Sequence, residues 1–154
     1  MISAVEALEG RLTVGRFFGY LSAQIPGALM GVLLAHAMFG LPLLQASAHA
    51  RAGWAQGLSE VIATFGLVLL VLRRFSIPKD QVPWLIGLYI LAAYWFTAST
   101  SFANPAVTIA RSLTDTFAGI RSVDAPAFIV AQILGAGTAF ALNRFIGKPE
   151  KAYG

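Results

Sequence analysis

Four long runs of apolar residues alternate with short polar segments along this chain. Each run is long enough, or nearly so, to cross the roughly 30 Å hydrocarbon core of a bilayer as an α-helix. The third run is the shortest, and its Trp84 suits a membrane interface. The pattern predicts an all-α membrane protein with four spanning helices. They run roughly from Phe17 to Phe39, from Trp54 to Leu72, from Val82 to Ser99 and from Ala125 to Ile146.

Between the third and fourth runs lies a segment from Pro105 to about Ile120 that is too short and too polar to cross. Asn104 before it is a favoured cap residue, and proline is pre-shaped for the first turn of a helix. A helix that begins inside a bilayer has to lie beside protein or a cavity. We therefore expect a half-helix in a re-entrant loop that begins at Asn104. An ordinary loop helix outside the membrane is the alternative.

Composition supports a membrane protein and excludes several other classes. Hydrophobic residues make up 57% of the 154 residues and charged residues only 12%, which is about half the share in soluble domains. The chain has no cysteine, and His36 and His49 are too scattered for a metal site. We expect no cofactor and no nucleic-acid partner, because the net charge of +4 is spread between apolar runs. No pair of carboxylates, no nucleophile beside a base and no phosphate loop is apparent, so no enzyme is predicted.

Basic residues divide unevenly between the two sides that four spans would create. Eight fall on the side that holds both termini, and three fall on the other side. Cytoplasmic segments carry the excess of positive charge, so we predict cytoplasmic termini and a half-helix loop that enters from outside. The eight are Arg11, Arg16, Arg73, Arg74, Lys79, Arg144, Lys148 and Lys151, and the three are Arg51, Arg111 and Arg121.

The ten residues from Ser101 to Ala110 place an Asn-Pro-Ala tripeptide at the expected helix start. This signature resembles that of the aquaporin, or major intrinsic protein, family. The preceding stretch from Gly87 to Ala103 is similar to a bacterial aquaporin subgroup associated with arsenic resistance. The resemblance implies an aquaporin-like fold and a passive channel for water and small uncharged solutes, such as glycerol or arsenite-type metalloid acids. It also implies a homotetramer in the lipid bilayer of the plasma or inner membrane.

Two parts of the chain resemble each other. Residues 19–28 and 127–136 share the pattern Ala-Gln-Ile-x-Gly-Ala, aligned on Gln24 and Gln132 at an offset of 108 residues. Internal repeats are common in channels and transporters. The chain therefore appears as two related units, each of which ends in a glutamine-bearing span.

The first of these units looks incomplete. Asn104 precedes Gln132 by 28 residues, and counting back 28 residues from Gln24 runs past the start of the chain. Met1 to Val5 looks like the continuation of a first Asn-Pro turn. Compared with the six-span family pattern, we expect one partial channel domain over residues 1–154, without the first two spans and the first Asn-Pro-Ala loop. A four-span protein as the intended product is the alternative.

The resemblance also assigns pore residues. In the family, two half-helices meet end to end at mid-membrane and their Asn side chains face the pore. The resemblance makes Asn104 the pore donor, with Pro105 and Ala106 holding the helix start. It implies that Tyr94 is a filter residue and that Ser101 offers its backbone carbonyl to the pore. Interfacial packing is the alternative for Tyr94.

Val107 departs from the family pattern. Strict water channels and glycerol channels usually carry arginine at this place. The loss of the guanidinium removes five donors and a fixed charge and widens the passage. The departure favours passage of larger uncharged polyols or hydroxylated acids over selection for water alone. Arg111 is one helical turn further on and cannot simply occupy the same spot.

Glu60 lies in an apolar span, where a carboxylate is costly unless it is partnered or neutral. The family carries Glu at this place as a buried support for loop N–H groups, and Gln24 and Gln132 would be similar supports. Two other functions stay open: a truncated, non-conducting remnant, or a fragment of a secondary transporter with Glu60 as its ion-coupling site. For His36 we expect an interfacial or loop-bonded role.

Overall fold

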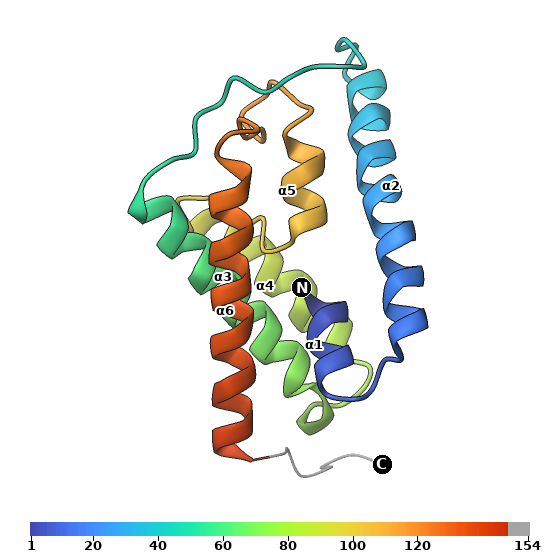
Figure 1. Ribbon diagram of the computed structural model, residues 1–154, viewed down its shortest axis with the longest axis vertical. Coiled ribbons are helices and arrows are strands. Elements are labelled where there is room, and N and C mark those ends of the chain that lie inside the picture. Colours follow the sequence, from blue (N-terminus) through green and yellow to red (C-terminus); the bar gives the residue numbers. More distant parts are fainter. Residues whose placement is uncertain (148–154) are drawn as a thin grey trace.

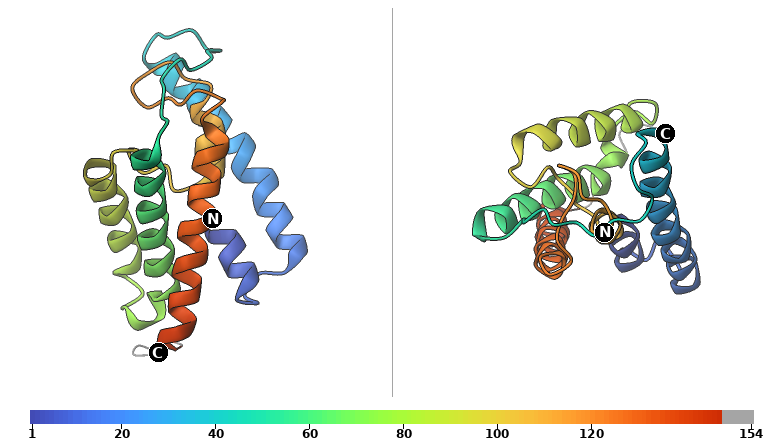
Figure 2. Two further views of the ribbon diagram at one scale, coloured as in Figure 1. Left: turned by 60° about the vertical axis from the view of Figure 1, so that its left-hand side comes forward. Right: turned by 90° about the horizontal axis from the view of Figure 1, so that it is seen from above.

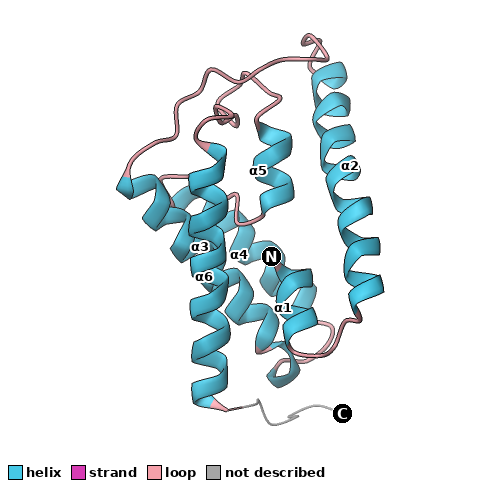
Figure 3. Ribbon diagram, in the orientation of Figure 1, coloured by secondary structure: helices cyan, strands magenta, loops and turns pink. Residues whose placement is uncertain are grey.

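The computed structural model describes residues 1–147, and that part of the chain contains helices and loops without a strand (Figure 3). The all-α prediction is therefore confirmed. The elements are α1 (Ile2–Leu8), α2 (Val14–Met38), α3 (Trp54–Leu72), the 3₁₀-helix η1 (Arg74–Ser76), α4 (Val82–Phe96), α5 (Pro105–Arg111) and α6 (Ala125–Ile146).

Three of the helices, α2, α3 and α6, are long and apolar enough to cross a membrane. The bounds of α3 and α6 match the sequence prediction. The α2 helix begins at Val14 rather than at Phe17. Its start is fixed by Thr13, whose side chain caps the helix by accepting the N–H of Arg16 at 3.4 Å.

The third predicted span is shorter than expected. The α4 helix has 15 residues and ends at Phe96, not at Ser99. Thr97 is already extended, with φ −103° and ψ 136°, and its hydroxyl donates to the carbonyl of Ala93 at 2.7 Å. The chain leaves the helix early because it has to build the loop that leads to Asn104.

The half-helix is also shorter than predicted, since α5 ends at Arg111 and not near Ile120. The Ser112 hydroxyl donates to the carbonyl of Ile109 at 2.7 Å, and the N–H of Ile120 returns to the carbonyl of Arg111 at 3.2 Å. Short polar side chains compete for backbone groups and so end helices. Residues 112–120 therefore form a folded loop at the far end of α5.

The α3 and α6 helices form the central packed pair. Val68, Leu72, Ala136 and Ala139 are buried together between them. A Cβ atom at Gly135 would collide with the backbone of α3 at Val61. The close approach of the two helices therefore requires glycine at this position.

Figure 1 shows α2 standing apart from α3, α4 and α6, with the two short helices in the space between. The α1 helix runs downward from mid-height and α5 runs upward from mid-height, so their N-terminal ends lie at a similar level. The two views in Figure 2 show the same arrangement. Contacts of α2 with α1 and with α5 join the two sides of the molecule.

Candidate functional site

The start of α5 is built by Asn104. This residue has extended backbone, with φ −156°, and its side-chain oxygen accepts the N–H of Ala106 at 3.1 Å. The hydroxyl of Thr108 donates to the Asn104 carbonyl at 3.1 Å. These bonds use the Oδ1 atom, and within the described part of the chain the amide nitrogen has no acceptor. The half-buried side chain can therefore offer its N–H₂ group to a solute.

The loop before Asn104 has an unusual backbone. Thr100, Ser101 and Ala103 all have positive φ, at 60°, 48° and 50°. Left-handed backbone costs about 1–3 kcal/mol per non-glycine residue and persists where its surroundings hold it. Such a loop needs a fixed set of hydrogen-bond partners that hold its backbone.

Glu60 supplies those partners from α3. Its buried carboxylate accepts the hydroxyl of Ser99 at 2.6 Å and the backbone N–H groups of Phe102 at 2.8 Å and Ala103 at 2.9 Å. Hydrogen bonds to an ionised acceptor are about twice as strong as neutral ones. The carboxylate thus holds two of the loop N–H groups that no helix or strand could satisfy.

Two glutamines join the short helices to the long ones. The Nε2 atom of Gln132 on α6 donates to the Glu60 carboxylate at 2.7 Å and to the Thr108 hydroxyl at 2.9 Å. The Nε2 atom of Gln24 on α2 donates to the Ser3 hydroxyl on α1 at 2.9 Å. In each half, a glutamine of a long helix therefore bonds to a hydroxyl of the adjacent short helix.

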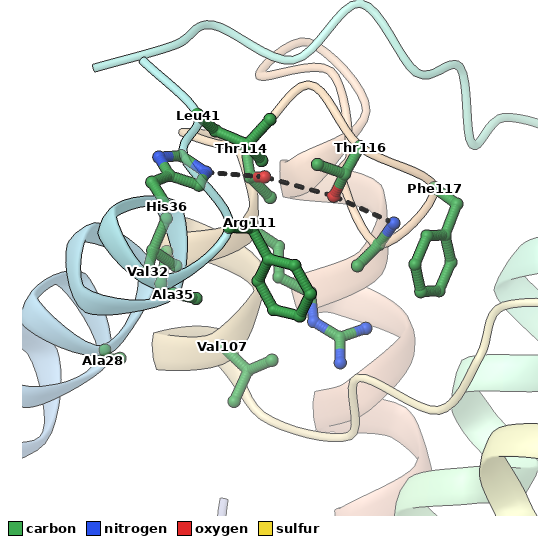
Figure 4. A pocket seen from close by; sticks show the side chains of 14 residues that line it. Ala28, Val32, Ala35, His36, Leu41, Val107, Arg111, Thr114, Thr116 and Phe117 are labelled. Carbon is green, nitrogen blue, oxygen red and sulfur yellow. Dashed lines mark hydrogen bonds between the residues drawn. The ribbon is translucent and has the colours of Figure 1, made fainter. Parts of the chain in front are cut away.

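Two cavities lie on the two sides of the α5 start. The cavity beside α1, which we name the inner cavity, has about 590 Å³ and is lined by Asn104 and Ala103 together with residues of α1, α2, α3 and α4. The cavity between α2 and α5, which we name the outer cavity, has about 630 Å³ and is lined by Val107 and Arg111 (Figure 4). The cap residue Asn104 thus faces one cavity and the turns of α5 that follow it face the other, so the helix start forms the boundary between them.

Two predicted pore residues lie elsewhere. Tyr94 is half-buried and packs edge-on against Trp95, with ring centres 5.7 Å apart. Neither Tyr94 nor Ser101 is part of the lining of the two cavities. Their pore roles stay predictions, and so does interfacial packing as the alternative for Tyr94.

Arg51 is a structural residue that the sequence analysis missed, because it was counted there only as a charge on the outer side. It is 5% exposed, and its guanidinium donates to the carbonyls of Gly119 at 2.7 Å, Ser99 at 3.0 Å and Phe117 at 2.7 Å. These acceptors lie 48 to 68 residues away in the sequence. Because they are backbone groups, no pattern of side chains near Arg51 could have indicated them.

Asp124 completes this arrangement at the start of α6. Its carboxylate accepts the backbone N–H of Arg51 at 2.9 Å and two bonds from the guanidinium of Arg121 at 3.0 and 3.2 Å. The bond from Arg121, with a smaller contribution from the Arg51 N–H, holds the pKa of the Asp124 carboxyl below its usual value. The two loops on this side of the molecule are therefore joined by charge-assisted bonds.

His36 is buried at the end of α2 and bonded on both ring nitrogens. Its Nδ1 lies 2.9 Å from the carbonyl of Leu43, and its Nε2 lies 2.8 Å from the hydroxyl of Thr114. Because a carbonyl can only accept, Nδ1 carries a proton in this arrangement. The contacts agree with the loop-bonded role that the sequence suggested.

Comparisons with known proteins agree with this architecture. The family model described as Major intrinsic protein matches residues 75–153, which is more than half of the chain. Aquaglyceroporin AqpS of Rhizobium meliloti (strain 1021) is 54% identical over 150 residues, covering 97% of this chain and 64% of that protein. The chain thus spans less than two thirds of the length of that relative. No solved structure matches.

The family match includes the Asn-Pro-Ala turn, α5 and α6, which are the elements that build the boundary between the two cavities. With its apolar helices, the match identifies a multi-pass membrane protein. On this evidence the chain belongs to the major intrinsic protein family.

Proposed function

We propose that this chain forms a passive channel for water and small uncharged solutes of the glycerol type. The observation that carries the proposal is the position of the α5 start between two cavities. Asn104 lines the inner cavity and Val107 lines the outer one. A solute that passes between the cavities has to pass this helix start, where the free amide of Asn104 can donate hydrogen bonds.

Glu60, Gln132 and Gln24 act in this proposal as supports rather than as solute contacts. Glu60 and Gln132 fix the strained loop and α5 from behind, while Gln24 fixes α1. Pro105 and Ala106 form the first turn that Asn104 caps. The geometry argues against a transporter fragment, because the Glu60 carboxylate already accepts four hydrogen bonds and has little capacity left for a coupling ion.

The solute class follows from Val107. Its short apolar side chain leaves the outer approach without the guanidinium that the family usually places there. This supports passage of larger polyols and hydroxylated acids, including the neutral triol form of arsenite. The name of the similar protein, aquaglyceroporin, supports the glycerol part of this proposal.

We also propose cytoplasmic termini, a location in the plasma or inner membrane and a homotetrameric assembly. The α1–α2 connection, η1 and the end of α6 lie at one end of the molecule (Figure 1). These segments carry Arg11, Arg73, Arg74 and Arg144, in agreement with the positive-inside rule. Lys148 and Lys151 were counted for the same side but lie outside the described residues.

Stopped-flow light scattering of proteoliposomes tests the channel. Vesicles that contain the purified chain should take up glycerol faster than protein-free vesicles. Asn104→Asp should reduce this uptake, because aspartate keeps the cap oxygen but replaces the amide donor with a negative charge. Equal uptake with and without the chain would instead support the alternative of a non-conducting remnant.

A further inference from the structure

Arg111, the last residue of α5, lines the outer cavity. Its Cζ atom lies 4.3 Å from the centre of the Phe102 ring. Phe102 is itself buried, and its ring packs edge-on against Phe128 with centres 5.2 Å apart. Since a cation–π contact with a buried ring restrains a guanidinium, Arg111 is held in a defined place within the cavity wall.

Two arginines contact the Phe102 ring, but they differ in how their donors are used. The Cζ atom of Arg51 lies 5.1 Å from the ring centre, and its guanidinium donates to three carbonyls. Among the described residues, the guanidinium of Arg111 makes one hydrogen bond, a long one of 3.4 Å to the hydroxyl of Thr100. A guanidinium has five N–H donors, so most donors of Arg111 remain available.

The other side chains that line the outer cavity do not occupy these donors. Among residues 1–147, Arg111 is the one Lys, Arg, Asp or Glu residue in its lining. The polar side chains of His36, Thr114 and Thr116 bond to one another, at 2.8 Å between His36 and Thr114 and 3.1 Å between the two threonines. In Figure 4 the side chain of Arg111 points away from this chain of bonds.

We propose that Arg111 is a binding subsite in the outer cavity for small polyols with hydroxyl groups on adjacent carbons. The planar fork of a guanidinium engages two neighbouring oxygens at once, and a vicinal diol presents such a pair. This inference rests on the proposed channel function and makes Arg111 a residue that determines its specificity.

The α2 wall suits the carbon side of the same solute. Ala28, Val32 and Ala35 of α2 line it with apolar groups, and Val107 adds another apolar group from α5 (Figure 4). A polyol that turns its oxygens to Arg111 places its C–H groups against these residues. Arg111 lies one helical turn beyond Val107 toward the loop end of α5. A solute that enters from the loop end of α5 is therefore oriented at Arg111 before it reaches the level of Val107.

A matched pair of isomers tests the specificity in proteoliposomes. Propane-1,2-diol and propane-1,3-diol have the same size and number of hydroxyls, but only the first has them on adjacent carbons. We expect faster protein-dependent uptake of the 1,2-isomer. Arg111→Lys keeps the charge but removes the fork, and it should lower the ratio of the two uptake rates roughly three- to tenfold, which corresponds to one net hydrogen bond. Arg121→Lys, on the same side of the molecule but outside the cavity lining, should leave the ratio unchanged.

An unchanged ratio in a conducting Arg111→Lys protein would overturn the subsite. If the wild-type chain conducts neither diol, the channel proposal fails and a binding measurement decides the subsite separately. Phenylglyoxal modifies accessible guanidinium groups, and mass spectrometry measures its reaction with each arginine. Propane-1,2-diol should slow the modification of Arg111 more than propane-1,3-diol does. The exposed Arg16 should react at the same rate in the presence of either diol. Equal protection of Arg111 by the two isomers, or none by either, contradicts the proposal.

Discussion

The side chains of Glu60 and Gln132, on the two central helices, meet at 2.7 Å in a fully buried contact. Through this contact the packing of α3 against α6 is tied to the loop at Asn104, because the same carboxylate accepts the N–H groups of Phe102 and Ala103. The stability of the central pair and the geometry of the α5 start are therefore coupled.

Glu60→Gln tests this coupling. Glutamine offers one oxygen where the carboxylate offers two, so its NH₂ group must face at least one donor that now has no acceptor. A buried donor left unpaired costs about 1–3 kcal/mol, and we expect a lower thermal midpoint in detergent. Glu9→Gln is the control, because Glu9 makes an ion pair with Arg11 at 3.0 Å near the surface, worth about 1 kcal/mol or less. Equal shifts in both variants would contradict the support role of Glu60.

Gly135 and Gly137 give a matched pair on one helix. A Cβ atom at Gly135 meets the backbone of α3, whereas one at Gly137 meets open space. Gly135→Ala should destabilise the fold by about 1–3 kcal/mol through overpacking. Gly137→Ala should be neutral or stabilise it by up to about 1 kcal/mol, since alanine favours helix. Unfolding in a graded detergent mixture measures both, and similar values would show that α3 and α6 do not approach closely at Gly135.

Val107→Arg tests the wider passage. The new guanidinium adds bulk and charge at the wall of the outer cavity, so uptake of polyols larger than glycerol should fall roughly tenfold while water uptake falls less. Val107→Leu adds bulk without charge and should reduce the uptake of these larger polyols to a smaller extent. Unchanged entry of the larger polyols in an active Val107→Arg channel would remove Val107 from the selectivity argument.

The lowered pKa of Asp124 predicts a pH dependence of stability. A carboxyl whose pKa is depressed in the folded state stabilises that state above its unfolded pKa of about 3.9, and this stabilisation is lost as the pH falls. The difference in thermal midpoint between wild type and Asp124→Asn should therefore be large at neutral pH. It should shrink as the pH falls below about 4. A difference that does not vary with pH would show that the bonds from Arg121 and Arg51 do not depend on the charge of Asp124.

The sequence predicted the fold class and most element bounds because long apolar runs and the Asn104–Pro105 start are local signals. The assignment to the aquaporin, or major intrinsic protein, family is confirmed, and so is the prediction that the chain is not an enzyme, since members of this family are channels. The expected continuation of a first half-helix turn at Met1 to Val5 stays a prediction.

The errors lie in segments where side-chain hydrogen bonds and loop backbone, rather than apolar periodicity, decide where a helix ends. The ends of α4 at Phe96 and of α5 at Arg111 depend on hydroxyl side chains and on a positive-φ loop, and apolar periodicity does not report these. Arg51 was missed because its acceptors are distant backbone carbonyls. The pore roles of Tyr94 and Ser101 stay predictions, as do the homotetramer and the cytoplasmic termini.

The four groups that donate hydrogen bonds to the Glu60 carboxylate have a consequence for how the protein is made. They come from residues 39, 42, 43 and 72 positions further along the chain. When α3 enters the bilayer, these groups, which all lie later in the chain, do not yet surround Glu60. The hydrogen bonds of this carboxylate therefore form only once the loop at Asn104 and α6 have joined α3.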